Sequence, residues 1–229
     1  MSMKYVMELD GLRFVDLSKD LIPGVETRRL EVRRYKSYPM EDYHSEIDIM
    51  SHLGTHIEAP YHHADELKDT FDIPLNHYIC RCVLLDLAHI QPKQPITAAD
   101  LEKADRGRVR KGDFVLLKSP YYFEPFTELA NSEQDKRPYL NGETARWLAE
   151  KEVYGVGFDN TISIEYSKES VKEFHDILMR KDVVFLEVMH HFDLLKKDVF
   201  LLMCVPLPIK GLDSCPVRPI AIEGIPGIE

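Results

Sequence analysis

The sequence has no long apolar run, and this absence limits where the protein can reside. No uninterrupted apolar segment approaches the roughly 18 to 20 residues that a membrane-spanning helix needs. The first ten residues, Met1 to Asp10, contain neither the apolar core nor the small-residue cleavage site of a secretory signal. We therefore expect a cytoplasmic protein with no membrane partner.

Basic residues and cysteines are also scarce. Lysine and arginine total 29 against 39 aspartates and glutamates, so the formal net charge is −10. No basic excess is available to neutralise phosphates, which argues against a nucleic-acid partner. The four cysteines, Cys80, Cys82, Cys204 and Cys215, are expected to be free thiols. Cys80 and Cys82 alternate beside an apolar run and should point together into a core, with a metal or redox pair as the alternative.

The sequence shows no internal repeat, low-complexity tract or long polar linker. Its 229 residues fit one domain, predicted to span residues 1–229, and are enough to bury a sizeable core. Strands are predicted at Arg13–Leu17, Glu31–Tyr35, Ser45–His52, Arg81–Leu87, Phe114–Lys118, Gly155–Phe158, Val183–Met189 and Val199–Val205. Helices are predicted at Thr97–Lys103, Asn141–Lys151 and Ser167–Lys181, with Thr97 and Asn141 as caps. This interleaving favours an α/β fold with a mixed sheet.

The stretch Tyr121–Pro138 is polar, aromatic and interrupted by prolines, which is typical of a long loop. Loops of this length are often binding lids, and others are disordered. Its aromatic residues can stack an aryl ring, or serve equally well as packing or subunit contacts: Tyr121, Tyr122, Phe123 and Phe126.

The densest chemistry lies between His52 and His63. Glycine, proline and β-branched residues disfavour a helix here. With a period of two, one face of an extended segment carries His52, Gly54, His56, Glu58, Pro60 and His62. Neutral imidazole and ionised carboxylate are ligands of divalent metals, so this face predicts a metal site. The alternative is a plain polar surface strand, and His63 is expected to be a core residue or a support for the ligands.

The spacing of His52 and His56 requires a bend in the chain. Four residues of straight strand would separate them by roughly 13 Å, which two imidazoles and a metal can hardly bridge. Gly54 lies at the midpoint and tolerates unusual backbone angles, while Pro60 can fix the exit direction.

A second group of candidates lies downstream. His175 falls among apolar residues at helical spacing, so it should face inward. Glu187 interrupts an otherwise apolar strand, and a buried carboxylate needs a cation or strong donors. A metal would satisfy Glu187; a salt bridge to an arginine or a protonated carboxyl are the alternatives.

The pattern from His52 to His62 resembles the H-x-G-T-H-x-D-x-P-x-H signature of the cyclase family of metal-dependent hydrolases, which includes bacterial kynurenine formamidase and isatin hydrolase. Other segments resemble the family as well: Val15-Asp16-Leu17-Ser18, Gly112 to Leu117, Trp147-Leu148, Val156 to Asp159, and His175 with Glu187 twelve residues later. The sequence departs from the family at Glu58, where Asp is usual, and it lacks the usual P-G-L before the helix at Asn141.

The resemblance implies a swivelling β/β/α-type fold with a central mixed β-structure, and a homo-oligomer, a dimer or tetramer. It implies one or two divalent ions, zinc or manganese first. His52, His56 and Glu58 would bind one ion. Glu58, His175 and Glu187 would bind a second, and His62 would be the catalytic acid/base.

The implied activity is hydrolysis of a C–N amide bond in a small molecule, with an aryl formamide such as N-formylkynurenine as the first choice. The ions would lower the pKa of bound water so that hydroxide forms near neutral pH. A histidine can take and return a proton in that range. The alternatives are a cyclic amide (isatin-like) or lactone hydrolase, and a catalytically attenuated metal-binding protein marked by Glu58.

Overall fold

The computed structural model describes residues 4–122, 132–165 and 167–228. Its strands are β1 Val6–Leu9, β2 Leu12–Asp16, β3 Leu30–Lys36, β4 Tyr43–Ile49, β5 His56–Glu58, β6 Ile79–Asp86, β7 Phe114–Lys118, β8 Tyr139–Leu140, β9 Gly155–Asp159, β10 Ser163–Ile164, β11 Val184–Met189, β12 Val199–Met203, β13 Ser214–Pro216 and β14 Ile220–Glu223. Its α-helices are α1 Ala98–Asp105, α2 Gly142–Glu150 and α3 Lys168–Met179. Short 3₁₀ helices lie at η1 Pro60–His62, η2 Leu75–His77 and η3 Phe192–Leu194.

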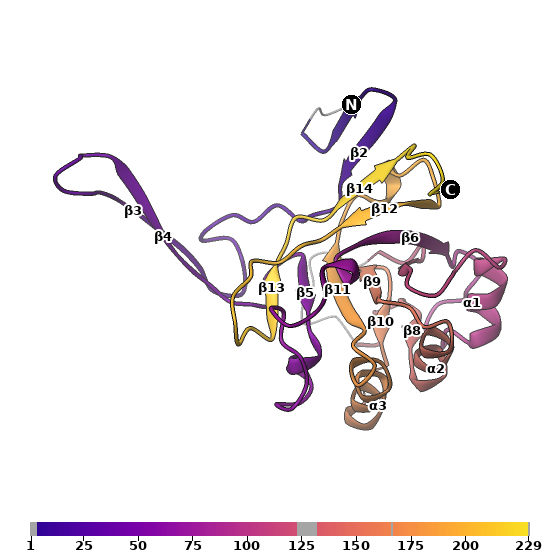
Figure 1. Ribbon diagram of the computed structural model, residues 1–229. Helices are drawn as coiled ribbons and strands as arrows, with labels where there is room; N and C mark the ends of the chain where they lie inside the picture. The colour runs from indigo at the N-terminus through magenta and orange to yellow at the C-terminus, as the bar shows by residue number, and fades with distance from the viewer. Residues whose placement is uncertain (1–3, 123–131, 166, 229) are drawn as a thin grey trace.

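One large mixed sheet organises the molecule, in the strand order β1-β2-β14-β12-β6-β7-β9-β11-β5-β13 (Figure 1). The central strands β6, β7, β9 and β11 are parallel, and the flanking strands pair antiparallel. This arrangement confirms the predicted α/β class with a mixed β-structure. Short β5 and β13 lie at one end of the sheet.

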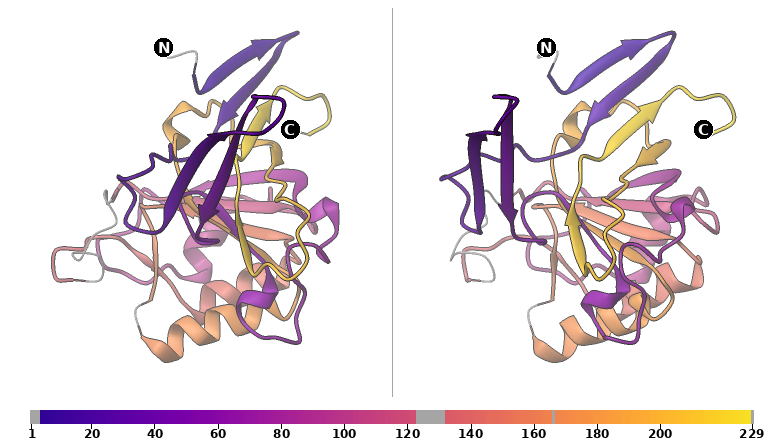
Figure 2. Two further views of the ribbon diagram at one scale, coloured as in Figure 1. Left: turned by 90° about the vertical axis from the view of Figure 1, so that its left-hand side faces the viewer. Right: turned by 60° about the vertical axis from the view of Figure 1, so that its left-hand side comes forward.

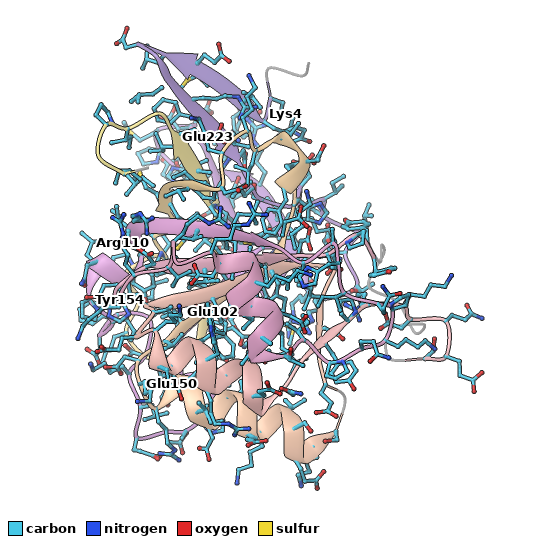
Figure 3. All side chains as sticks on the ribbon, turned by 90° about the vertical axis from the view of Figure 1, so that its right-hand side faces the viewer. Lys4, Glu102, Arg110, Glu150, Tyr154 and Glu223 are labelled. Carbon is cyan, nitrogen blue, oxygen red and sulfur yellow. The ribbon has the colours of Figure 1, made fainter. Side chains whose placement is uncertain are left out.

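Alternating residues of the central strands enter two separate cores. Val115 and Leu117 of β7 pack against the helices α1, α2 and α3. Phe114 and Leu116 face the opposite core, which contains Ile57 of β5 and residues of β2, β12 and β14. Figure 3 shows Glu102 and Glu150 on the helical side of the sheet, away from Glu223 on β14. The strand alternation thus places helices on one face and the outer strands on the other.

The predicted helices are confirmed, and their caps explain where two of them begin. Thr97 and Asp100 form a capping box at α1. Asn141 accepts from Glu143 N and Thr144 N at α2, satisfying donors that the helix leaves unpaired. The predicted strand Ser45–His52 ends at Ile49, because the chain turns over residues 51–55.

The antiparallel pair β3 and β4 forms a projecting arm (Figures 1 and 2). Nearly every residue of the two strands is exposed, with Leu30 half-buried. The strand predicted at Glu31–Tyr35 lies within β3, but no local pattern indicated that it would project from the body.

Other predictions have mixed outcomes. All four cysteines are free, and Cys80 and Cys82 both pack in the core opposite the helices. Among the described residues, no helix is long and apolar enough to cross a membrane. The predicted loop Tyr121–Pro138 includes Phe123 and Phe126, which lie outside the described residues. Tyr121 is half-buried and Tyr122 is exposed.

Candidate metal centre

A turn at Gly54 folds the candidate ligand segment back on itself. Gly54 has φ +59°, and a Cβ there would lie 2.4 Å from the Leu21 side chain. Thr55 fixes the turn by donating to the carbonyl of Val188 at 2.6 Å and accepting from Lys19 N at 2.8 Å. The bend predicted at Gly54 is therefore confirmed. The interpretation of residues 52–62 as one extended segment was wrong, because only β5 is a strand and Pro60 begins the 3₁₀ helix η1.

The strand β5 is enclosed on both edges by strands from much later in the chain. His56 lies opposite Glu187 of β11 on one side and Pro216 of β13 on the other. Glu58 lies opposite Phe185 and Ser214. This position buries His56 and Glu58 almost completely. Their side chains are consequently held by the sheet and removed from solvent.

Each of three histidines uses one ring nitrogen as an anchor. His52 Nε2 lies 2.7 Å from Asp213 Oδ2, and His56 Nδ1 lies 2.7 Å from the Gly54 carbonyl oxygen. His175 Nδ1 lies 2.7 Å from the carbonyl of Val171, one turn earlier in α3. Each oxygen can accept the N–H of its ring, so the other ring nitrogen points toward Glu58 and becomes a metal ligand once it is deprotonated. Metal-binding histidines are typically held in this way.

The Glu58 carboxylate lies where these rings converge. Its Oε1 is 2.7 Å from His52 Nδ1 and 3.3 Å from His56 Nε2. Its Oε2 is buried and has no hydrogen-bond partner among the described residues. A buried, unpartnered carboxylate oxygen is costly unless a cation satisfies it. The imidazole nitrogens of His52 and His56 and this carboxylate oxygen fit a divalent metal. The extra methylene of Glu58, compared with Asp, does not prevent its carboxylate from reaching both histidines.

His62 and His175 extend the cluster toward the surface. Ligand atoms of Glu58, His62 and His175 lie within 4.8 Å of one another, as do those of His52, His56 and Glu58. His175 is buried on α3, as predicted, with its ring 5.1 Å from that of Phe185. His62 is exposed and lines a pocket of about 520 Å³ with His63, His175, Ser167, Lys168, Val171 and Lys172.

Glu187 is placed by an irregularity in β11. The register shifts between Leu186 and Met189, and Val188 has φ +54°. A β-branched residue rarely adopts this conformation, and bulges of this kind re-aim side chains beside functional sites. Glu187 Oε2 then lies 3.9 Å from His56 Nε2. Among the described residues, Glu187 belongs to none of the three groups whose ligand atoms lie within 4.8 Å of one another. Its role as a ligand stays a prediction.

Asp213 is a site residue that sequence reasoning missed. It lies just before β13 and contacts His52, 161 residues earlier, and its Oδ2 is also 3.4 Å from His62 Nδ1. His63, expected to be a core residue or a support for the ligands, is half-buried, pairs with Asp176 at 2.9 Å and stacks on the His175 ring at a centroid distance of 6.0 Å. No local pattern around Asp213 could have revealed contacts that depend on the pairing of β13 with β5.

The electrostatics of the cluster follow from burial and close carboxylates. Burial alone would lower the pKa of His52, but hydrogen bonds to Glu58 and Asp213 outweigh it and raise the pKa to about 9. Burial would raise the pKa of Glu58, yet hydrogen bonds from His52 and His56 hold that pKa far below its ordinary value. Burial and the nearby charge of Glu58 raise the pKa of Glu187 to about 7. Burial lowers the pKa of His175, which favours the neutral ring that a metal needs.

Comparison with known proteins assigns the chain to a family. The model of the family described as "Putative cyclase" matches residues 15–166, which include the whole segment from His52 to His62. The chain belongs to this cyclase family. The predicted resemblance is thus confirmed.

Members and structural neighbours of the cyclase family agree with this assignment. The kynurenine formamidase of Bordetella petrii is 30% identical over 183 residues, covering 78% of this chain and 80% of the relative. The structure of a protein described as a predicted metal-dependent hydrolase from Bacillus stearothermophilus is 27% identical, with a TM-score of 0.72 and coverage of 93% of this chain and 99% of that one. Isatin hydrolase A from Labrenzia aggregata has a TM-score of 0.77 at 20% identity, with coverage of 93% and 94%, and supports the fold alone.

Proposed function

We propose that this protein is a metal-dependent amidohydrolase that cleaves the C–N bond of an aryl formamide resembling N-formylkynurenine. The observation that carries the proposal is the convergence of His52 and His56 on a buried Glu58 carboxylate, with His175 close by. Relatives named kynurenine formamidase, 25% to 30% identical, support amide hydrolysis as the reaction class.

The proposed ligands are His52, His56 and Glu58 for one ion and Glu58, His175 and Glu187 for a second. A divalent ion such as zinc or manganese, when bound, polarises a carbonyl and makes water more acidic. The residues contribute fixed ring orientations, because each histidine is held through its other nitrogen. The β5–β11–β13 pairing keeps water away from His56 and Glu58.

His62 is the proposed acid/base, and its position suits proton transfer in both directions. It lines the pocket, and its ring centroid lies 4.5 Å from that of His52. In the reaction, water adds to the formyl carbon and the C–N bond breaks, giving formate and an aryl amine. His62 takes a proton from the water and returns it to the departing nitrogen. Asp213, 3.4 Å from His62 Nδ1, orients the ring.

The pocket suits a substrate with an apolar ring and an anionic group. Val171 lines the pocket with an aliphatic side chain, and Lys168 and Lys172 line it from the same face of α3. Neither lysine forms an ion pair with a described residue. Their ammonium groups are therefore available to a carboxylate such as that of the amino-acid part of N-formylkynurenine.

A substrate panel with metal analysis tests this function. Purified protein is assayed for metal per chain and for turnover of N-formylkynurenine, isatin and small lactones. We expect bound metal, formate release from N-formylkynurenine, and loss of turnover on metal removal and in His62→Ala. If the protein turns over isatin or a lactone in preference to N-formylkynurenine, the proposed aryl formamide is the wrong substrate class and a cyclic amide or lactone takes its place. Bound metal without turnover of any compound would favour the attenuated metal-binding protein.

A further inference from the structure

Asp213, the side chain that anchors His52, lies in a connecting segment and not in a strand or helix. This segment, residues 204–213, joins β12 to β13, and β13 then runs beside β5 (Figure 1). A connecting segment keeps a fixed position only where other parts of the chain pair with its backbone groups. The position of Asp213 therefore depends on the partners of the residues just before it.

The first of these partners is Asp69, a buried residue that begins a turn over residues 69–72. Its Oδ1 accepts from Phe71 N at 3.0 Å and from Asp72 N at 2.9 Å. Its Oδ2 accepts from Gly211 N at 2.6 Å. One carboxylate oxygen thus closes the turn, and the other holds the connecting segment two residues before Asp213.

The carboxyl group of Asp69 is ionised in this position. Burial would raise its pKa, but hydrogen bonds from Gly211 N and Asp72 N, together with Lys210, outweigh burial and lower that pKa. An ionised carboxylate can accept at both oxygens. Lys210 is 64% exposed and pairs with Asp72 as well as with Asp69, so solvent screens its contribution. The buried hydrogen bond to Gly211 is therefore the main tie.

Two further backbone contacts complete the support of Asp213. Thr70 N, in the turn, donates to the carbonyl of Leu212 at 3.0 Å, and Ala59 N, just after β5, donates to the carbonyl of Asp213 at 2.9 Å. The turn is itself tied to the core, because the buried Tyr78 hydroxyl donates to the Thr70 carbonyl at 2.9 Å. Asp213 is thus held between the turn and β5.

This support matters because the contacts of Asp213 tolerate little displacement. Asp213 Oδ2 lies 2.7 Å from His52 Nε2 and 3.4 Å from His62 Nδ1. Carboxylates only accept hydrogen bonds, so His52 donates its Nε2–H to Asp213. A displacement of Asp213 by about 1 Å would take both contacts beyond the range of a hydrogen bond.

We propose that Asp69 is a positioning residue of the metal centre, whose buried carboxylate holds Asp213, through Gly211, at the distance from which Asp213 orients His52 and His62. The hydrogen-bond partners of Asp69 among the described residues include none of the proposed ligands, and Asp69 does not line the pocket. Asp69 therefore acts only through Asp213. This inference rests on the proposed function in that it assigns a support to the same site.

The substitution Asp69→Asn separates the two roles of the carboxylate. The amide oxygen can still accept from Phe71 N and Asp72 N and keep the turn, whereas the amide NH₂ presents a donor to the N–H of Gly211. Asp72→Asn is the matched control, because it makes the same change three residues later in an exposed carboxylate that pairs only with Lys210. Urea unfolding and circular dichroism establish that both variants are folded.

The first readout is the ring N–H of His52 in protein freed of metal with a chelator. Its ¹H–¹⁵N NMR signal is assigned by its loss in His52→Gln. We expect the signal to stay in place in Asp72→Asn, and to shift or broaden through exchange with water in Asp69→Asn. If Asp69→Asn does not fold, Asp69→Ser gives the same readout, since its single oxygen can close the turn but cannot serve Gly211 as well.

The second readout is metal affinity, measured by competition with a chelator. Asp69→Asn should lower the affinity about tenfold, the lower end for a lost partner of a metal ligand, and Asp72→Asn less than about twofold. In an Asp213→Asn background, Asp69→Asn should cause no further loss, because residues that act through one contact are not additive.

An unchanged His52 signal in Asp69→Asn would overturn the proposal. So would a further tenfold loss of affinity in the Asp213→Asn background, which would show that Asp69 acts by another route. A protein that binds no metal, or turns over no formamide, would contradict the proposed function instead. The His52 signal requires neither metal nor substrate, so it would still decide whether Asp69 positions Asp213.

Discussion

At the scale of single residues, the candidate metal centre depends as much on anchors as on ligands. Asp213, the Gly54 carbonyl and the Val171 carbonyl each hold one histidine through the nitrogen that faces away from Glu58. Two of these anchors are backbone atoms and cannot be removed by substitution. Asp213 is a side chain, so it is the anchor that an experiment can change.

Substitution of Asp213 should weaken metal binding. Asp213→Asn removes the charge beside His52, so the pKa of His52 in metal-free protein should fall from about 9. Metal affinity should fall about 10- to 100-fold, as for other lost partners of metal ligands. A competition titration against a chelator measures the affinity, and NMR measures the histidine pKa. Asp193→Asn, at an exposed position on η3, is the control. Unchanged affinity would contradict the anchoring role.

Glu58 is the residue at which this chain departs from its family. Its longer side chain still reaches both His52 and His56. Glu58→Asp withdraws the carboxylate by one methylene, so we expect turnover of N-formylkynurenine to fall about 10- to 100-fold with metal still bound. Steady-state kinetics with metal analysis measures this. Higher turnover in Glu58→Asp would instead favour the attenuated protein.

At the scale of elements, turns and bulges place the site more than the regular strands do. The turn at Gly54 brings His52 back over β5, and the bulge at Val188 directs Glu187 toward His56. Both features involve positive φ angles. They are linked, because Thr55 donates to the Val188 carbonyl.

Gly54 should therefore be intolerant of a side chain. Gly54→Ala places a Cβ 2.4 Å from Leu21 and adds the cost of a left-handed backbone, about 1–2 kcal/mol. Urea unfolding should show a larger loss than that, together with weaker metal binding. Gly107→Ala is the matched control: its φ is +73°, but no atom lies within 4 Å of the added Cβ. Equal effects of the two variants would show that contact with Leu21 is unimportant.

The face of α3 that lines the pocket should select anionic substrates. Lys168→Met with Lys172→Met should raise the KM for N-formylkynurenine about three- to tenfold, the range for exposed charge contacts. The kcat should change little. Formanilide has no carboxylate and serves as the internal control, with unchanged kinetics. A similar change for both substrates would contradict a carboxylate contact.

The sequence was sufficient for features that depend on local patterns. Helix α3, inward-facing His175 and the bend at Gly54 follow from periodicity, capping and chain geometry. Strand β5 is three residues long and exists because β11 and β13 pair with it, so no local signal marks it. The same non-local pairing brings Asp213 to His52. The family resemblance supplied the ligand roles, which the spacing alone left open.

At the scale of the whole molecule, the buried charges couple folding to pH. The folded pKa of His52 is raised from 6.5 to about 9, so its stabilising contribution is complete below pH 6.5 and is lost as pH rises through 9. Glu187 has a folded pKa raised from 4.5 to about 7, so its contribution is lost as pH rises through 7. Both pKa shifts therefore make the metal-free protein more stable against unfolding at lower pH.

Rising pH should therefore lower the stability of the metal-free protein and increase the stabilisation that bound metal provides. Metal-free protein should melt at a lower temperature at pH 9 than at pH 7, because His52 loses its proton. Metal binding requires deprotonated ligands, so the increase in melting temperature on adding metal should grow over the same range. Calorimetry with and without chelator measures both. A pH-independent increase would show that His52 does not release a proton on binding.

The enclosure of β5 also determines when the site can exist during synthesis. Residues 56–58 are synthesised well before the strands that lie on either side of them, 184–189 and 214–216. His175 and Asp213 are equally late. A growing chain thus carries His52, His56 and Glu58 before it contains the strands β11 and β13, which hold these side chains together. The converged arrangement of these side chains can therefore form only after residues 214–216 have been synthesised.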